Sequence, residues 1–212
     1  MQIKWLGHAC FYITTKEGVK VLTDPYDEAI GLRMPPLAPD VATVSHQHYD
    51  HNAVGLLRGA PTVLDTTGTH RVKGITVRGI PTFHDKKNGA ERGPNTVFII
   101  EADGLRVCHL GDLGHLLDAG KLREIGPVDV LLVPVGGTYT IAAEEAATLV
   151  KDIKPRIAVP MHYKIRDLKI SIAPVDNFLK HFESVEHKPL LELVPDALPR
   201  ATAVVVLERT ES

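Results

Sequence analysis

Runs of apolar residues divide the chain into many short strands, most of them in its first half. Segments 3–15 (IKWLGHACFYITT) and 19–24 (VKVLTD) read as strands separated by a turn around Glu17 and Gly18. Within 95–112, Asp103-Gly104 separates two apolar runs and predicts a hairpin. Further strands are predicted at 41–45 (VATVS), 62–65 (TVLD), 74–83 (GITVRGIPTF), 129–135 (DVLLVPV), 156–162 (RIAVPMH) and 201–208 (ATAVVVLE).

Helical patterns occur only in the second half, where they alternate with strands. Residues 119–126 (AGKLREIG) predict a short helix ended by Gly126, and 173–182 (APVDNFLKHF) predict another. Residues 140–154 (TIAAEEAATLVKDIK) predict a longer helix with Thr140 as its N-cap, early glutamates and late lysines. The order of elements favours sheets whose outer faces are covered by helices.

Composition describes an ordinary globular chain. Of 212 residues, 44% are hydrophobic and 24% charged, which is enough for a core, so we expect one domain over 1–212. The formal net charge of -2 gives no bulk attraction to nucleic acid. Two cysteines, no signal-peptide pattern and no apolar run of membrane-spanning length predict a cytoplasmic protein that does not enter membranes.

Residues 45–52 (SHQHYDHN) contain an unusual density of side chains that can bind metal, directly after a predicted buried strand. His46 and His48 can point the same way, and a bend at Tyr49 and Asp50 would turn Asp50 and His51 toward the same point. Three imidazoles and a carboxylate in one loop suit one or two divalent metals. A polar loop whose histidines merely cap a strand is the alternative, but it explains the density of ligands poorly.

The pattern His-x-His-x-Asp-His resembles the signature of the metallo-β-lactamase superfamily. Later strands end in PTFHD, CHLGD and AVPMHYK, which supply His84, Asp112 and His162 in the order that the superfamily uses. The motifs LGHACF, RGPNTVFI, GDLGH and PVGGTYT are closer to its small UlaG-like branch, whose named member is a phosphorylated ascorbate lactonase. The resemblance implies an α/β fold, a four-layer αββα sandwich with a metal site at one edge between the sheets.

The resemblance also implies the ligands of a dinuclear site. His46, His48 and His84 would hold the first metal, and Asp50, His51 and His162 the second. Asp112 would bridge the two ions. His109 and His115 compete with His84, because TFHD departs from the usual third-ligand loop.

Two metals that share an oxygen ligand provide hydroxide at neutral pH. We therefore expect a hydrolase that attacks a lactone or ester carbonyl or a phosphodiester of a small substrate, phosphorylated or not. Zinc is the first choice, with manganese or iron as alternatives. A di-iron oxidoreductase is disfavoured because flavodiiron proteins place a glutamate where His48 stands. A nuclease is disfavoured because the chain has no added substrate-binding arm.

Several other residues are candidates for catalysis or substrate binding. Asp50 could orient the hydroxide and accept a proton, and His115, three residues after Asp112, is the second catalytic candidate. His8, Asn95, Tyr139 and Tyr163 are candidates for substrate binding, each with a structural alternative. The loop 28–39, with three prolines, could form a lid over the cleft, or Leu32 and Met34 could pack in the core or in an interface between copies of the chain.

Overall fold

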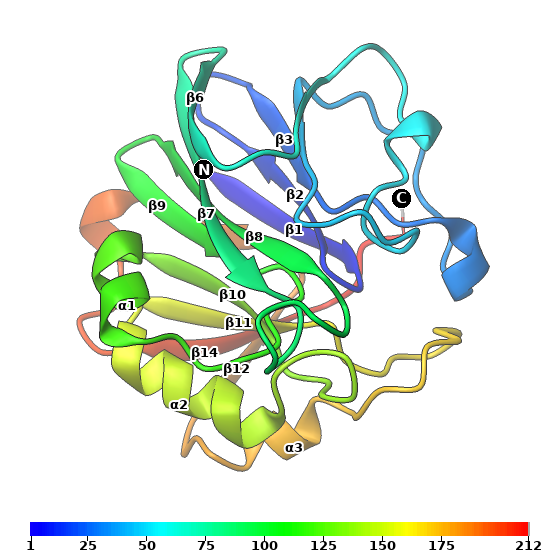
Figure 1. The fold of residues 1–212 in the computed structure, drawn as a ribbon. Helices are drawn as coiled ribbons and strands as arrows, with labels where there is room; N and C mark the ends of the chain where they lie inside the picture. The colour runs from blue at the N-terminus through cyan, green and yellow to red at the C-terminus, as the bar shows by residue number, and fades with distance from the viewer. Residues whose placement is uncertain (212) are drawn as a thin grey trace.

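Two β-sheets packed face to face form the centre of the molecule (Figure 1). The computed structural model describes residues 1–211. One sheet has six strands in the order β13-β1-β2-β3-β4-β5, and the other has eight in the order β12-β14-β11-β10-β9-β8-β7-β6. Helices lie outside the sheets, so the predicted sandwich of the α/β class is confirmed.

The strands are short, as their sequence patterns predict. The six-stranded sheet contains β13 (Leu191–Glu192), β1 (Gln2–Gly7), β2 (Cys10–Thr14), β3 (Lys20–Thr23), β4 (Val41–Thr43) and β5 (Thr62–Leu64). The eight-stranded sheet contains β12 (Val185–Lys188), β14 (Ala203–Leu207), β11 (Ile157–Met161), β10 (Val130–Pro134), β9 (Leu105–His109), β8 (Pro94–Ala102), β7 (Ile75–Phe83) and β6 (Gly68–Val72).

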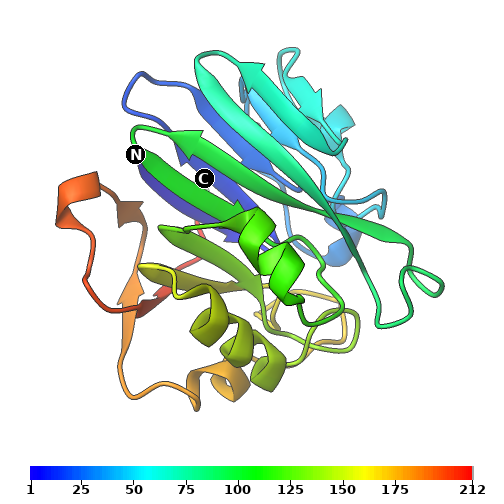
Figure 2. The same ribbon diagram turned by 60° about the vertical axis from the view of Figure 1, so that its left-hand side comes forward.

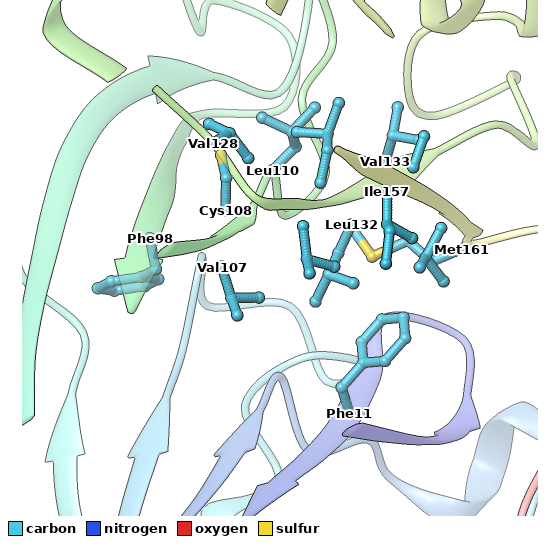
Figure 3. Close-up of a cluster of buried hydrophobic side chains, with 14 of the residues drawn as sticks. Phe11, Phe98, Val107, Cys108, Leu110, Val128, Leu132, Val133, Ile157 and Met161 are labelled. Atoms are coloured by element: carbon cyan, nitrogen blue, oxygen red, sulfur yellow. The ribbon is translucent and has the colours of Figure 1, made fainter. Parts of the chain in front are cut away.

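Alternation of side chains along the six-stranded sheet fills two separate apolar layers. Trp5 and Phe11 belong to the main core between the sheets, whereas Leu6 and Cys10 belong to a second cluster on the outer face. Figure 3 shows Phe11 of β2 pointing toward Leu132 and Met161 of the opposite sheet. The six-stranded sheet therefore contributes one face to the main core and needs a cover on the other.

An irregular segment provides that cover. Tyr26, Ile30, Leu32 and Met34 are buried against the outer face of the six-stranded sheet, together with Leu168. The segment contains the short 3-10 helix η1 (Glu28–Ile30), and the other 3-10 helices are η2 (Val54–Leu56) and η3 (Pro195–Ala197). Leu32 and Met34 thus pack in the core, which is one of the three alternatives predicted for this loop.

The middle of the eight-stranded sheet is parallel and apolar on both faces. Strands β9, β10, β11 and β14 run parallel, and every residue of β10 and β11 is buried. Such strands need helices over the face turned away from the core. Figures 1 and 2 show the helices on this outer side. They are α1 (Ala119–Ile125), α2 (Ala143–Ile153) and α3 (Asp176–Leu179).

Most predicted elements are present, and the differences have local causes. The segment 3–15 is a hairpin rather than one strand, because the chain reverses through Gly7 and His8, both with positive φ. Helix α2 begins after Ala142, whose N–H donates to Glu145, so the prediction of Thr140 as its N-cap is wrong. Helix α3 covers only a small part of 173–182.

Connections that carry the candidate ligands leave the strands at one edge of the sandwich. They follow β4, β7, β9 and β11, and the β1–β2 turn lies beside them. Within residues 1–211, no helix combines the length and the apolar character needed to cross a lipid bilayer.

Candidate metal centre

Asp112 lies at the centre of a group of histidines contributed by different connections. Its Oδ2 lies 3.3 Å from Nε2 of His84 and 3.2 Å from Nε2 of His162, and its Oδ1 lies 3.3 Å from Nε2 of His51. Nε2 of His46 is 4.0 Å from Oδ2. One carboxylate therefore faces ligands from both halves of the predicted site, as a bridging group would.

Two sets of donor atoms surround this carboxylate. His46, His48 and His84 form one set whose ligand atoms all lie within 4.8 Å of one another. Asp50, His51 and His162 belong to a second set, whose ligand atoms also all lie within 4.8 Å of one another. The structure thus brings together all seven side chains that the resemblance identified as ligands.

The donors suit divalent cations. Nε2 of His46 and Oδ1 of Asp112 are buried without a hydrogen-bond partner among the described residues. Buried polar atoms left unpaired are costly, and a metal ion would satisfy these at once. Imidazole nitrogens mixed with carboxylate oxygens match zinc, manganese or iron.

Electrostatics favours a neutral imidazole at His46 and a charged carboxylate at Asp112. Burial lowers the pKa of His46 to about 3, so its ring is neutral at pH 7, as a ligand must be. Burial alone would raise the pKa of Asp112, but His162 and His51 hold it well below its usual value. In the same way, Asp112 and Asp24 outweigh burial and raise the pKa of His51. A metal that binds His51 must therefore displace a proton.

Asp24 supports the centre and was not identified from sequence. Its Oδ2 accepts hydrogen bonds from Nδ1 of His51 at 2.9 Å and from Oγ of Ser45 at 2.5 Å. Oγ of Ser45 lies 3.0 Å from Nδ1 of His46. The fully buried Asp24 therefore fixes the ring orientation of His51 directly. Its only sequence signal is its place after a buried strand, in the same position as the ligands.

Asn95 supports Asp112 and does not line the cavity. Its Oδ1 accepts the backbone N–H of Asp112 at 2.9 Å, and its Nδ2 donates to Oγ1 of Thr82 and to the carbonyl of Leu110. Gly111 permits this close approach, since a Cβ there would lie 2.4 Å from Oδ1 of Asn95. These bonds occupy the amide that was predicted to bind substrate.

Three other predicted residues lie away from the cavity. The backbone N–H of Phe83 donates to Nε2 of His115, and Nδ1 of His115 donates to the carbonyl of Leu116, so both ring nitrogens are engaged outside the metal-ligand groups. Tyr163 is buried with its ring centroid 5.0 Å from that of Trp5. His8 is fully buried beside Asp50. The competitor His109 lies in β9, where its ring bonds the carbonyl of Ala9.

A cavity of about 510 Å³ opens onto the ligands. The candidate ligands His48, Asp50 and His84 line it, and so does Tyr139. The guanidinium of Arg92 lies 5.6 Å from the centroid of the Tyr139 ring. The remaining lining includes Ala29, Ile30, Lys169, Ile170 and Ser171. Of the loop 28–39, only Ala29 and Ile30 reach the cavity.

Comparisons with known proteins agree with this geometry. The family described as "Beta-lactamase superfamily domain" matches residues 2–162. A UPF0173 protein of Pyrococcus abyssi is 36% identical, covering 77% of this chain and 83% of its own. A UPF0173 metal-dependent hydrolase of Thermoplasma acidophilum is 33% identical, covering 79% and 85%.

Solved structures show the same relationship. A crystal structure from Thermotoga maritima, named as a candidate zinc-dependent hydrolase of the metallo-β-lactamase superfamily, has a TM-score of 0.82 and 43% identity over 98% of both chains. The metallo hydrolase Igni18 of Ignicoccus hospitalis shares the fold, with a TM-score of 0.69 and 22% identity over 99% of this chain and 96% of its own. The chain therefore belongs to the metallo-β-lactamase superfamily, within the UPF0173 family of metal-dependent hydrolases.

Proposed function

We propose that the chain is a dinuclear metallohydrolase that cleaves a lactone, an ester or a phosphodiester in a small substrate. The observation that carries the proposal is the gathering of seven side chains, Asp112 among them, at an open cavity. Two bound divalent ions would supply an activated water and positive charge for the oxyanion that forms.

The ligands divide into two positions around one bridge. His46, His48 and His84 would hold the first ion, and Asp50, His51 and His162 the second. Asp112, with its two oxygens directed at different histidines, would bridge them. His48 is exposed and lines the cavity, so the first position would be the more accessible to a substrate.

Asp50 is the residue best placed to handle a proton. It is half-buried and lines the cavity, unlike the fully buried His51. Burial would raise its pKa, but the hydrogen bond with His8 and the charge of His51 hold the pKa well below the usual value. An ionised carboxylate at this place can orient a water by accepting a hydrogen bond from it, and can then take its proton and pass it to the leaving group.

The walls of the cavity suit a small substrate with an anionic group. The volume of about 510 Å³ lies within the range typical of small-molecule sites. Lys169 is exposed on one wall and forms no ion pair with any residue in the range 1–211. A phosphorylated or carboxylated substrate could therefore place its charge at Lys169 and its scissile bond near Asp50.

The proposal extends to the metal, the cellular compartment and the class of substrate. Zinc is the first choice for the first position, where the ligands include three imidazoles. Both cysteines are buried and free, in keeping with a reducing cytoplasm. The cavity wall offers no basic stripe for a nucleic-acid strand, which disfavours the nuclease alternative.

The test combines metal analysis with a panel of substrates. Metal-free protein is loaded with Zn²⁺ or Mn²⁺ and assayed with small lactones, a chromogenic carboxylic ester and a chromogenic phosphodiester. We expect hydrolysis in at least one class, abolished by chelator and reduced roughly 10²-fold or more by Asp50→Asn. Asp152→Asn, which changes an exposed carboxylate on α2, is the matched control. Loaded protein that hydrolyses nothing but consumes oxygen in the presence of iron and a reductant would instead support the di-iron alternative.

A further inference from the structure

His8 lies at the metal centre but cannot reach a substrate. It stands in the β1–β2 turn with no exposed surface, and it does not line the cavity. This placement argues against the substrate contact expected from sequence. A buried histidine whose Nε2 faces the candidate metal ligands needs another explanation.

The ring of His8 points its Nε2 at the second set of ligands. This atom lies 3.2 Å from Oδ2 of Asp50 and 3.1 Å from Nε2 of His51. Together with a nitrogen of His162, these donors all lie within 4.8 Å of one another. Ligands bound to one ion at roughly 2.0–2.2 Å stand roughly 3.0–3.5 Å apart when they are neighbours. The spacing around His8 is therefore that of atoms which share an ion.

Asp50 lies within hydrogen-bond distance of Nε2 of His8, but Nε2 of His51 lies closer still. Nδ1 of His51 faces Asp24, which leaves its Nε2 directed toward the same point as Nε2 of His8. Nδ1 of His8 is buried without a hydrogen-bond partner in the described chain, as are those of His84 and His162. Two imidazole nitrogens that face each other at 3.1 Å can share at most one proton, and a cation between them satisfies both.

The backbone holds His8 in this orientation. Its φ is 53°, a left-handed conformation that is costly for a residue other than glycine. The carbonyl of His8 accepts Nε1–H of Trp5 and the backbone N–H of His162, both at 3.0 Å. The turn is thus fixed to the strand that precedes it and to a ligand of the same set. Strain of this kind is retained where a side chain has to be placed accurately.

We propose that His8 is a further ligand of the second metal position. The inference rests on the second position in the proposed function but does not depend on the reaction. His8, Asp50, His51, His162 and the bridging Asp112 would give five protein donors, and a water would complete six. Six ligands suit manganese or ferrous iron better than zinc, which prefers four. The two positions would then differ in metal preference.

Metal titration of His8 variants distinguishes two roles for His8: binding the metal, or only orienting Asp50. Calorimetry measures the binding of Mn²⁺ to metal-free wild type, His8→Ala and His8→Gln. The glutamine amide nitrogen can replace Nε2 as a hydrogen-bond donor to Asp50, but it does not replace an imidazole as a ligand. We expect both variants to bind the second Mn²⁺ at least about tenfold more weakly and the first unchanged. Wild-type affinity in His8→Gln would contradict the proposal.

A structure of the wild-type protein with Mn²⁺ needs no variant and covers the case in which the variants do not fold. Anomalous diffraction locates the manganese ions. We expect Nε2 of His8 at a bonding distance from the second ion, roughly 2.0–2.3 Å. A second ion bound by Asp50, His51 and His162 with His8 more than about 3 Å away would overturn the proposal. Neither experiment uses a substrate, so a failed search for hydrolysis would leave this inference standing.

Discussion

Side chains outside the seven proposed ligands hold those residues in place. Asp24 accepts from His51 and Ser45, and Asn95 accepts the backbone N–H of Asp112. Partners of this kind orient ligands and raise their basicity. The geometry of the site therefore depends on residues one step removed from the cavity.

Asp24→Asn should weaken metal binding without unfolding the protein. An asparagine side chain tolerates the left-handed backbone at this position, where φ is 38°, but its oxygen carries no charge to hold His51. We expect the affinity for metal at the second position to fall roughly 10- to 100-fold, measured by calorimetry. Asp40→Asn, which alters a carboxylate that accepts a backbone N–H from Lys20, is the control. Equal affinities in the two variants would show that Asp24 has no supporting role.

The role of a single residue could be predicted from the sequence only where its spacing from other candidate ligands along the chain determines where its side chain lies. His46, His48, Asp50 and His51 share one short loop, so their convergence follows from the local chain. His115 lies only three residues after Asp112 in the sequence. The turn after β9 nevertheless directs its ring to backbone groups of Phe83 and Leu116. Such a direction depends on contacts between distant segments and cannot be deduced from spacing.

Among the elements, apolar strands were readily predicted and polar ones were not. Strands β10 and β11 are continuous apolar runs, whereas β12 has three exposed residues out of four and β6 has none buried. A polar edge strand is recognisable only by the neighbour with which it pairs, such as β14 for β12. The β1–β2 hairpin was missed because a histidine occupies its turn.

Leu32 and Met34, in the segment before the ligand loop, pack in the core and do not line the cavity. Leu32 is 1% exposed and packs with Tyr26 and Leu168, so Leu32→Ala should leave a cavity and lower the free energy of unfolding by about 2–5 kcal/mol. Metal content should not change. Leu56→Ala, at a residue 48% exposed, should cost less than about 0.5 kcal/mol in the same denaturant titration. Unchanged stability in Leu32→Ala with a raised KM would instead identify a lid.

One carboxylate, that of Asp85, holds the loop 86–92 next to the cavity. Its contribution to the stability of the fold depends on pH. Asp85 accepts the backbone N–H groups of Lys87, Gly89, Glu91 and Arg92, and these bonds lower its pKa to about 2 against the opposing effect of burial. A group whose pKa is lower in the folded state stabilises the fold above its unfolded pKa of about 3.9. That contribution is lost as the pH falls toward about 2.

Asp85→Asn should therefore be less stable than wild type at pH 7, and the difference should disappear as the pH falls from about 4 to about 2. Denaturant titrations at a series of pH values measure it. Asp152→Asn again serves as the control, because its exposed carboxylate accepts no such set of backbone bonds. A stability difference that is independent of pH would contradict the role given to the Asp85 charge.

At the scale of the whole molecule, residues near the N-terminus pair with residues near the C-terminus, and both sheets contribute to one core. Gln2 of β1 pairs with Glu192 of β13, and Trp5 forms a bridge with Arg209. The main core takes side chains from both sheets. We therefore expect metal-free protein to unfold in one transition, with fluorescence of Trp5 and circular dichroism coinciding. Two separated transitions would argue against a single domain over residues 1–212.

The central claim is that seven side chains at one edge of the sandwich hold two ions around Asp112. The most direct measurement is elemental analysis of purified protein after exposure to excess Zn²⁺ or Mn²⁺ and removal of unbound metal. We expect about two ions per chain in the wild type and a clear loss in Asp112→Ala, with the circular dichroism spectrum unchanged. Wild-type protein that retains no metal, or Asp112→Ala that retains the full amount, would contradict the claim.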